Sequence, residues 1–319
     1  MSELPWIEKY RPKSLDDVID HNEKITTLRG LIATNQLPHL LLYGPPGSGK
    51  TSLILALARD LYGEEYKKYI TEINGSSERG IDTIRVNVMN FIQTRSDKVK
   101  LVILDEADAL TGEAQGALKS VMEQYSKVSR FCLICNDVHK ISPALQSRSV
   151  KMVFSSLRPD SIKGKLVQVV QQENIDVDDE GIDALIELEK DFRQLLNVLQ
   201  GMHTYYKALG QSIDADRVYN YMGKPTSQCV DTMIKALFSK SYIDAYNVLV
   251  DLNKNNSINL VDMTHFLMKK LLTMNLPISQ MHFLIGTLSQ IDRNIRIGCN
   301  AEIQLAFLAS AFLKARNDK

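Results

Sequence analysis

The first half of the chain alternates short apolar runs with longer stretches in which apolar residues recur every three or four positions. Runs of this length suit strands, and the stretches between them suit helices. A regular alternation of the two is typical of a mostly parallel sheet covered by helices on both faces. The pattern therefore predicts an α/β domain with a five-stranded sheet, whose strands we expect at residues 40–43, 69–73, 101–104, 131–135 and 150–154.

The strand pattern ends near Ser155 and does not return. Beyond it the apolar spacing indicates helices, the first two over residues 160–173 and 179–188. The Gly223-Lys224-Pro225 segment interrupts this pattern, because glycine and proline end regular elements. We expect three domains: an α/β domain over residues 1–157, a small helical lid over 158–223, and an all-α packing and oligomerisation domain over 224–319.

One segment of the α/β domain has the pattern of a phosphate-binding loop. The expected strand 40–43 runs directly into GPPGSGKT at 44–51, and a helical stretch follows. In such a P-loop, backbone N–H groups at the helix start and the lysine surround phosphate oxygens. A glycine-rich octamer alone can be only a flexible turn. The expected nucleotide contacts are Gly44, Pro45, Pro46, Gly47, Ser48, Gly49, Lys50, Thr51 and Ser52.

A second segment supplies the acidic partner of that loop. The apolar run VKLVIL at 99–104 ends in Asp105 and Glu106. Asp105 stands where a carboxylate would hold Mg²⁺ together with Thr51, and Glu106 where a base would orient an attacking water. Two acids after an apolar run can also be a solvated strand end, but the conjunction with the P-loop indicates an ATPase that uses ATP and Mg²⁺.

Three further polar residues are candidates for the same site. Asn136 ends the expected strand 131–135, where it is either a turn former or a contact of the γ-phosphate or the attacking water. Arg148 precedes the last strand, and it is either a surface ion-pair residue or an arginine finger. Arg193 begins an amphipathic helix, a position at which the helix dipole disfavours a cation, so it should have an anionic partner such as a triphosphate.

Composition limits the remaining possibilities. The chain has 319 residues, 24% charged and 44% hydrophobic, with a formal net charge of zero, so a nucleic-acid partner would need a local basic surface. Cys132 and Cys135 form a C-x-x-C pair without a second pair at zinc spacing, which favours buried strand cysteines. The polar N-terminus and the absence of long apolar runs lead us to expect a soluble, intracellular protein.

Six motifs in this order resemble one family. They are LPWIEKYRP at 4–12, LPHLLLYGPPGSGKTS at 37–52, SERGID at 77–82, LVILDEADAL at 101–110, RFCLICNDVHKISPALQSR at 130–148 and FRQLLNVLQ at 192–200. Together they resemble the small subunits of replication factor C over the whole chain. The resemblance implies an α/β P-loop AAA+ domain, an all-α lid and an all-α collar. It also implies a subunit of the hetero-pentameric clamp loader, which uses ATP to open the sliding clamp and load it onto primer–template DNA in replication and repair.

The resemblance assigns a role to each candidate. Lys50, Thr51, Asp105 and Glu106 would be the Walker A and Walker B residues, Asn136 sensor 1 and Arg193 sensor 2. Arg148 would be a finger that acts in trans on the ATP of a neighbouring subunit. The opening segment would close over adenine and ribose through Ile7, Tyr10, Arg11 and Val18.

The resemblance also implies a DNA-facing surface. Arg79, Arg85 and Lys140 match positions that face the DNA backbone inside the family's subunit spiral. Phosphate contacts position a protein without reading sequence, which suits a loader that works at any primer end. For each residue the alternative is a solvated surface charge.

Three alternatives stay open at this point. A branch-migration helicase would share the nucleotide chemistry but would add a winged-helix domain, for which residues 226–319 give no β-hairpin signal. A scaffold that binds nucleotide with little hydrolysis would differ only in turnover. A subunit of an alternative, checkpoint clamp loader would differ in its clamp. We expect a nuclear protein if the source is eukaryotic and a cytoplasmic one if it is archaeal.

Overall fold

The computed structural model describes residues 4–317 apart from residues 35, 78–79, 240 and 255–257. The chain divides into two compact units. One comprises residues 1–176 with 185–205, and the other comprises residues 177–184 with 206–319. The predicted domain boundaries at 157 and 223 stay predictions.

The first unit is built on a five-stranded parallel sheet with the strand order β2-β3-β4-β1-β5. The strands are β1 (Leu40–Tyr43), β2 (Ile70–Asn74), β3 (Lys100–Asp105), β4 (Ser129–Cys135) and β5 (Val150–Val153). In register, Leu40 of β1 lies opposite Cys132 of β4 and Val150 of β5. The five predicted strands are confirmed: β1 has the predicted bounds, and the other four have ends that differ by at most two residues.

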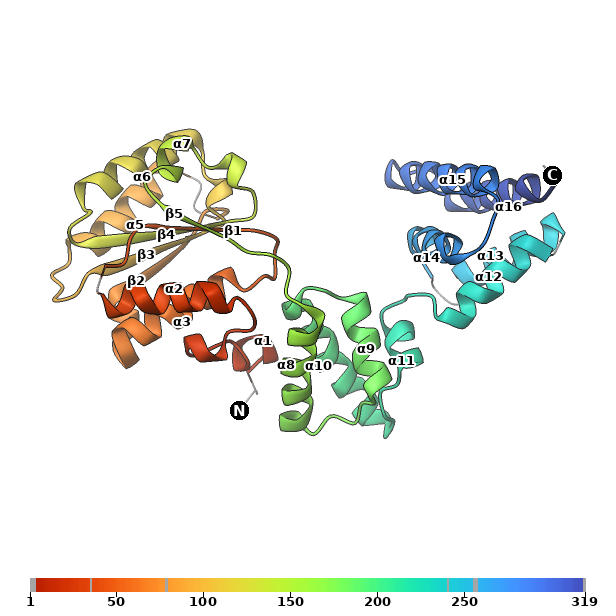
Figure 1. The fold of residues 1–319 in the computed structure, drawn as a ribbon, viewed down its shortest axis with the longest axis horizontal. Helices are drawn as coiled ribbons and strands as arrows, with labels where there is room; N and C mark the ends of the chain where they lie inside the picture. Colours follow the sequence, from red (N-terminus) through yellow and green to blue (C-terminus); the bar gives the residue numbers. More distant parts are fainter. Residues whose placement is uncertain (1–3, 35, 78–79, 240, 255–257, 318–319) are drawn as a thin grey trace. The chain divides into compact units, whose positions relative to one another are not determined.

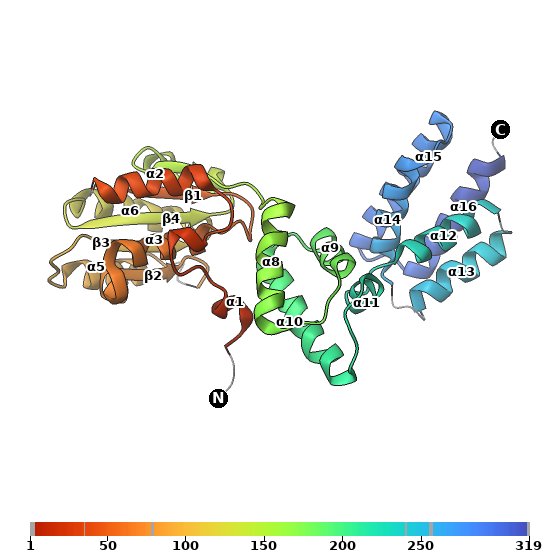
Figure 2. The same ribbon diagram turned by 60° about the horizontal axis from the view of Figure 1, so that its bottom comes forward.

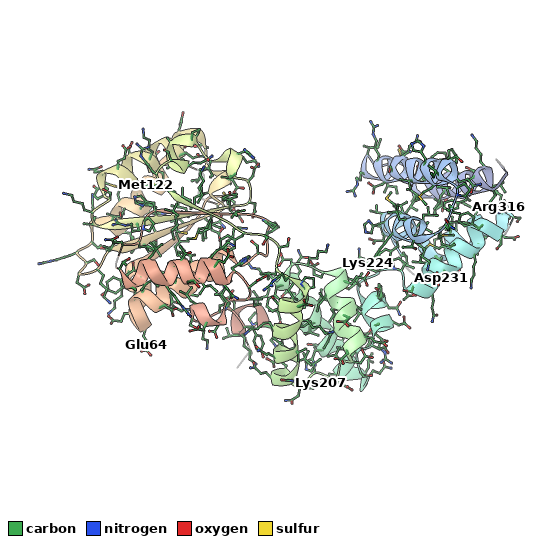
Figure 3. The ribbon with its side chains drawn as sticks, viewed as in Figure 1. Glu64, Met122, Lys207, Lys224, Asp231 and Arg316 are labelled. Carbon is green, nitrogen blue, oxygen red and sulfur yellow. The ribbon has the colours of Figure 1, made fainter. Side chains whose placement is uncertain are left out.

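Helices cover both faces of this sheet because its central strands β1, β3 and β4 are apolar on both sides. Leu40 and Leu42 pack into a core with α2 (Asn22–Ala33) and α3 (Lys50–Tyr62), whereas Leu41 packs into a core with α5 (Ile81–Gln93) and α6 (Gly112–Gln124). Figure 1 shows α2 and α3 on one face of the sheet and α6 on the other. Met122, labelled in Figure 3, belongs to the second core and is 1% exposed.

Cys132 and Cys135 are buried in β4, which confirms the prediction of buried strand cysteines. Cys132 belongs to the core under α3, and Cys135 belongs to the core under α6. Burial raises the pKa of the Cys135 thiol to about 12. Because the thiolate is the reactive form of cysteine, these side chains are packing residues.

The helices that follow the sheet belong partly to the first unit and partly to the second. Figure 2 shows α1 (Trp6–Lys9) beside α8 (Pro159–Glu173) and α10 (Phe192–Leu209). Short helices connect the elements around the sheet: η1 (Leu15–Asp17), η2 (Gly63–Glu65), α4 (Tyr66–Tyr69), η3 (Ala107–Ala109), η4 (Val138–Lys140) and α7 (Pro143–Gln146). Helices α9 (Asp179–Leu188) and α10 contribute residues to both units.

The regular elements of the second unit are all helices among its described residues, apart from one isolated bridge between Val177 and Ile213. Its other helices are α11 (Ala215–Tyr221), α12 (Ser227–Ser239), α13 (Tyr242–Lys254), α14 (Leu260–Thr273), α15 (Ile278–Arg296) and α16 (Ala301–Asn317). A single apolar core joins α12 to α16. Asp231, labelled in Figure 3 on α12, pairs with Lys270 of α14 at 2.8 Å. Of the helices described, none combines the length and the apolar character that a membrane span requires.

Candidate active site

The loop between β1 and α3 has the backbone of a phosphate cradle. Gly44, Gly47 and Gly49 all have positive φ, at 147°, 70° and 88°, where residues with a Cβ are strained. The loop ends at the N-terminus of α3, a helix of 13 residues that begins at Lys50. Backbone N–H groups without helical partners and the positive end of the helix dipole meet there, so the loop favours an anion.

The first glycine of the loop is required by a second contact. A Cβ on Gly44 would collide with the backbone carbonyl of Phe154, just beyond β5. Phe154 is fixed in that position, because its N–H donates to the Tyr43 carbonyl at 2.7 Å and its side chain is 1% exposed. The end of β5 therefore determines where the P-loop starts.

Gly44→Ala should destabilise the chain by about 1–3 kcal/mol, because the added methyl group combines a backbone clash with a strained φ. The measurement is the free energy of unfolding from urea titration. Gly116→Ala is the matched control, since Gly116 is a helical glycine of α6 with no atom near its missing Cβ. That change should stabilise by about 0.5–1 kcal/mol. Equal destabilisation by both variants would contradict the assigned clash.

Lys50 lies inside the loop and is 7% exposed. Its ammonium donates to the carbonyls of Gly44 and Pro45, both at 2.8 Å, and to Oδ1 of Asn136 at 3.0 Å. Burial lowers the pKa of Lys50, and the nearby Asp105 carboxylate opposes that shift. A phosphate oxygen would replace one neutral acceptor by a charged one, which makes a stronger hydrogen bond.

Thr51 and Asp105 meet across the carboxyl edge of the sheet. The Thr51 hydroxyl, in the first turn of α3, donates to Oδ2 of Asp105 at the end of β3 over 2.7 Å. The other carboxylate oxygen, Oδ1, accepts the N–H of Glu106 at 2.9 Å. Two hard oxygen ligands that converge in this way fit Mg²⁺, which is commonly held by one or two carboxylates together with substrate phosphates.

Glu106 is held in an unusual backbone conformation. Its φ is 52°, one of four positive values among the described residues other than glycine. Gly75 makes room for it, since a Cβ there would clash with the Glu106 carbonyl. Residues in this region carry strain that clusters at functional sites. The turn leaves the Glu106 side chain exposed beside Asp105.

Asp108 orients the neighbouring strand end, a role that the sequence analysis missed. Its Oδ2 accepts the backbone N–H groups of Asn136 at 3.2 Å and of Asp137 at 3.1 Å. This fixes Asn136 where its amide oxygen meets Lys50. The sequence does contain a sign of this role, because Asp108 is the third acidic residue of the run LVILDEADAL. Its place just after a strand predicts that it lies near the end of β4.

A pocket beside the P-loop is lined by eight of the predicted nucleotide-binding residues. They are Ile7, Tyr10, Arg11, Val18, Gly47, Gly49, Ser52 and, from α10, Arg193. Additional lining residues, which the sequence analysis did not single out, are Pro12, Ile19, Leu157, Lys165, Phe192 and Leu196. The apolar members suit a flat base, and Lys165 and Arg193 add positive charge near the loop.

The N-terminal wall of this pocket is fastened to the helices behind it. The backbone N–H of Trp6 donates to Oε1 of Gln200 at 3.1 Å, and the centroid of the Trp6 ring lies 5.7 Å from that of His203. The Tyr10 hydroxyl donates to the Glu173 carboxylate, which also pairs with Lys9 at 2.5 Å. Burial and then Glu173 raise the pKa of Tyr10, so the hydroxyl keeps its proton. Helices α8 and α10 thus position residues 6–10.

Two other predicted residues, Arg148 and Lys140, belong neither to the P-loop site nor to the lining of the pocket beside it. Arg148 follows α7, donates to the Ala144 carbonyl at 3.0 Å, and forms an ion pair with Glu123 of α6. Within this chain Arg148 therefore forms a surface ion pair, one of the two roles considered from the sequence. Its role as an arginine finger stays a prediction. Lys140 is exposed at the end of η4. Arg79 and the side chain of Arg85 lie outside the described part of the structure.

Comparisons with known proteins complete this picture. Residues 40–157 match the ATPase family associated with various cellular activities (AAA), and residues 225–311 match the replication factor C C-terminal domain. Replication factor C subunit 3 of Schizosaccharomyces pombe is 38% identical over 97% of this chain and 91% of its own length. The chain belongs to the family of replication factor C subunits. Human replication factor C subunit 5 is likewise 38% identical, over 98% of this chain and 93% of its own.

Membership in the replication factor C subunits confirms the fold class and the activity expected from the sequence. The chain is an AAA+ P-loop ATPase subunit of a clamp loader. A solved structure of RuvB from Thermotoga maritima, a Holliday junction branch migration motor, aligns with a TM-score of 0.57 at 16% identity, over 77% of this chain and 88% of that one. At that identity the likeness concerns the fold alone, so the helicase alternative gains nothing from it.

Proposed function

We propose that this subunit binds Mg²⁺–ATP in the pocket beside its P-loop and hydrolyses it within a hetero-pentamer of replication factor C subunits. In that complex it helps to open the sliding clamp and load it onto primer–template DNA during replication and repair. The observation that carries the proposal is the 2.7 Å contact of Thr51 with Asp105, next to Lys50 and Asn136. An ATPase needs these groups within reach of the same phosphates.

Each residue has a task that follows from its position. The N–H groups of residues 47–51 and Lys50 hold the β- and γ-phosphates. Thr51 and Asp105 would hold Mg²⁺, which when bound neutralises charge on the phosphates. Glu106 accepts a proton from the attacking water or orients it, and Asn136 holds that water or the γ-phosphate. Adenine and ribose are covered by Ile7, Tyr10, Arg11 and Val18. Arg193 reaches the phosphates from the lid.

Two surfaces would connect this site to the assembly. Arg148 is exposed and lies outside its own pocket, which supports a role at the ATP of a neighbouring subunit. Arg79, Arg85 and Lys140 would contact the DNA backbone through their charges. The all-α lid (158–223) and collar (224–319) would support assembly, and we place the protein in the nucleus, because the similar subunits come from eukaryotes.

Lys50→Ala should weaken ATP binding by about 10–100-fold, because a charge-assisted contact to phosphate is lost. The measurement is the Kd for a fluorescent ATP analogue, followed by clamp loading in a reconstituted pentamer that carries the variant. Lys67→Ala, which removes an exposed lysine of α4, is the control and should change neither quantity. A Lys50→Ala complex that loads clamps at the wild-type rate would show that ATP at this subunit is not needed.

A further inference from the structure

Two consecutive left-handed residues precede α2. Asp20 has a φ of 64° and His21 a φ of 61°. Such values are uncommon outside glycine, and two in succession persist only when surrounding contacts hold them. His21 is the N-cap residue of α2, yet its side chain makes no capping hydrogen bond. The imidazole is instead turned toward the P-loop.

The His21 ring is buried and contacts Ser48 of that loop and Phe154 beside it. It is 7% exposed, and its Nε2 lies 3.0 Å from the carbonyl oxygen of Ser48. The ring also meets Phe154 edge to face at 4.8 Å between centroids. Phe154 is the residue whose carbonyl confines Gly44. His21 and Phe154 therefore hold the P-loop at Ser48 and at Gly44.

The contact at Ser48 has a direct consequence for the phosphate cradle. In a planar trans peptide, the C=O and the following N–H point in opposite directions. The Ser48 carbonyl points to His21, so the N–H of Gly49, in the same peptide, points away from it. Gly49 lines the proposed nucleotide pocket. Fixing the carbonyl therefore fixes the direction of one donor that a P-loop offers to phosphate.

Lys24 determines which ring nitrogen of His21 donates. Its ammonium lies 3.4 Å from Nδ1 and 5.4 Å from the centroid of the Phe154 ring. An ammonium can only donate, so Nδ1 accepts and the proton lies on Nε2. Burial lowers the pKa of His21, which keeps the ring neutral. This arrangement provides the Nε2–H donor that the Ser48 carbonyl needs.

Asp20 extends the same turn to the start of α8. Its carboxylate accepts the backbone N–H of Arg158 at 3.2 Å and pairs with the Arg158 guanidinium at 2.9 Å. Arg158 is the N-cap residue of α8, whose Lys165 lines the pocket. One two-residue turn thus contacts the P-loop, the residue after β5, and the helix that begins after the sheet.

We propose that His21 is a positioning residue of the ATP site. Its Nε2–H holds the Ser48 carbonyl outward so that the Gly49 N–H faces the phosphates. The inference rests on the proposed ATP-binding function, and it adds a residue that belongs to no motif of the sequence. It predicts that His21 matters for the phosphates of the nucleotide and not for the base.

Three substitutions at His21 separate this role from a purely structural one. Glutamine places an N–H at about the reach of Nε2, whereas asparagine favours the left-handed backbone and helix capping but is too short. His21→Ala and His21→Asn should raise the Kd for ATP about tenfold, because the loop carbonyl loses its donor. The Kd of His21→Gln for ATP should stay within about threefold of the wild-type value. His282→Ala, at an exposed position on α15, is the control.

The specific readout compares ATP with adenosine, each measured as a Kd by competition against a fluorescent ADP analogue. Adenosine affinity should change less than about twofold in all variants, since it has no phosphate. Equal losses for ATP and adenosine, or full ATP affinity in His21→Asn, would overturn the proposal. A wild-type chain that binds no ATP would instead defeat the proposed function.

A measurement on the wild-type chain covers the case in which the variants fail to fold. Long-range ¹H–¹⁵N correlation on protein with labelled histidine reports which ring nitrogen is protonated. We expect the Nε2–H tautomer for His21, both with and without ATP. A ring protonated only on Nδ1 would overturn the proposal, because that tautomer cannot donate to the Ser48 carbonyl.

Discussion

Arg148→Ala is expected to lower ATP hydrolysis at the neighbouring subunit by about 10³-fold or more in the assembled complex, while its own chain still binds ATP. Removal of an arginine finger costs this much because a fixed cation stabilises the charge of the transition state. The structure supports an effect on the neighbour and not on the chain's own ATP binding. Arg148 is exposed, and it is not among the residues that line the pocket of its own chain. Its planar guanidinium can reach a phosphate bidentately.

The measurement is single-turnover hydrolysis in a complex in which only the neighbour that faces Arg148 keeps an intact P-loop lysine. Arg29→Ala is a matched control, because Arg29 is likewise exposed and paired with an acid, Asp16. An equal loss in both variants would indicate a general effect of charge. Unchanged hydrolysis in the Arg148→Ala complex would mean that the contact with Glu123 is the whole role of this arginine.

Glu106→Gln is expected to slow hydrolysis at its own site by about 10²–10⁴-fold with little change in ATP affinity. Loss of a positioned general base has an effect of this size. Glutamine keeps the length of the side chain, and the Asp105 contacts with Thr51 and with the backbone do not involve the Glu106 carboxylate. The change therefore removes the proton acceptor and leaves the remaining geometry in place.

The rate of a single turnover in the reconstituted pentamer, with clamp and primed DNA, tests this expectation. Glu113→Gln, at an exposed position in the first turn of α6, serves as the control. If wild type itself shows bound ATP and no turnover, the subunit is a nucleotide-binding scaffold. If wild type turns over and Glu106→Gln matches it, another group performs the proton transfer.

The sheet was predictable because its central strands β1, β3 and β4 are apolar on both faces, as in β1 with Leu40, Leu41 and Leu42 all buried. Strand ends were less predictable, since Tyr69 joins α4 and Phe154 leaves β5 to cover the P-loop. In the site, Lys50, Thr51 and Asp105 could be assigned because each lies in a contiguous motif whose spacing follows from phosphate and metal chemistry. Their convergence in the structure agrees with that assignment.

The remaining contacts depend on residues that are distant in sequence. Tyr10 and Glu173 are 163 positions apart, and nothing in either segment identifies the other as its partner. Nothing in the sequence around His21 predicts its contact with the P-loop, since a lone histidine before a helix is usually a surface or capping residue. Only the folded backbone, with its two left-handed residues, brings that ring to the Ser48 carbonyl.

The fastening of residues 6–10 to α8 and α10 has a consequence for the stability of the first unit. The walls of the nucleotide pocket come from three segments that the chain brings together: residues 7–19, 47–52 and 157–196. A nucleotide bound among them joins all three. Any ligand that binds only the folded state adds a stabilisation of RT ln(1 + [L]/Kd), about 2.7 kcal/mol at a hundredfold excess over Kd. ATP bound in the proposed pocket would therefore stabilise residues 7–19, the P-loop and helices α8 and α10 together.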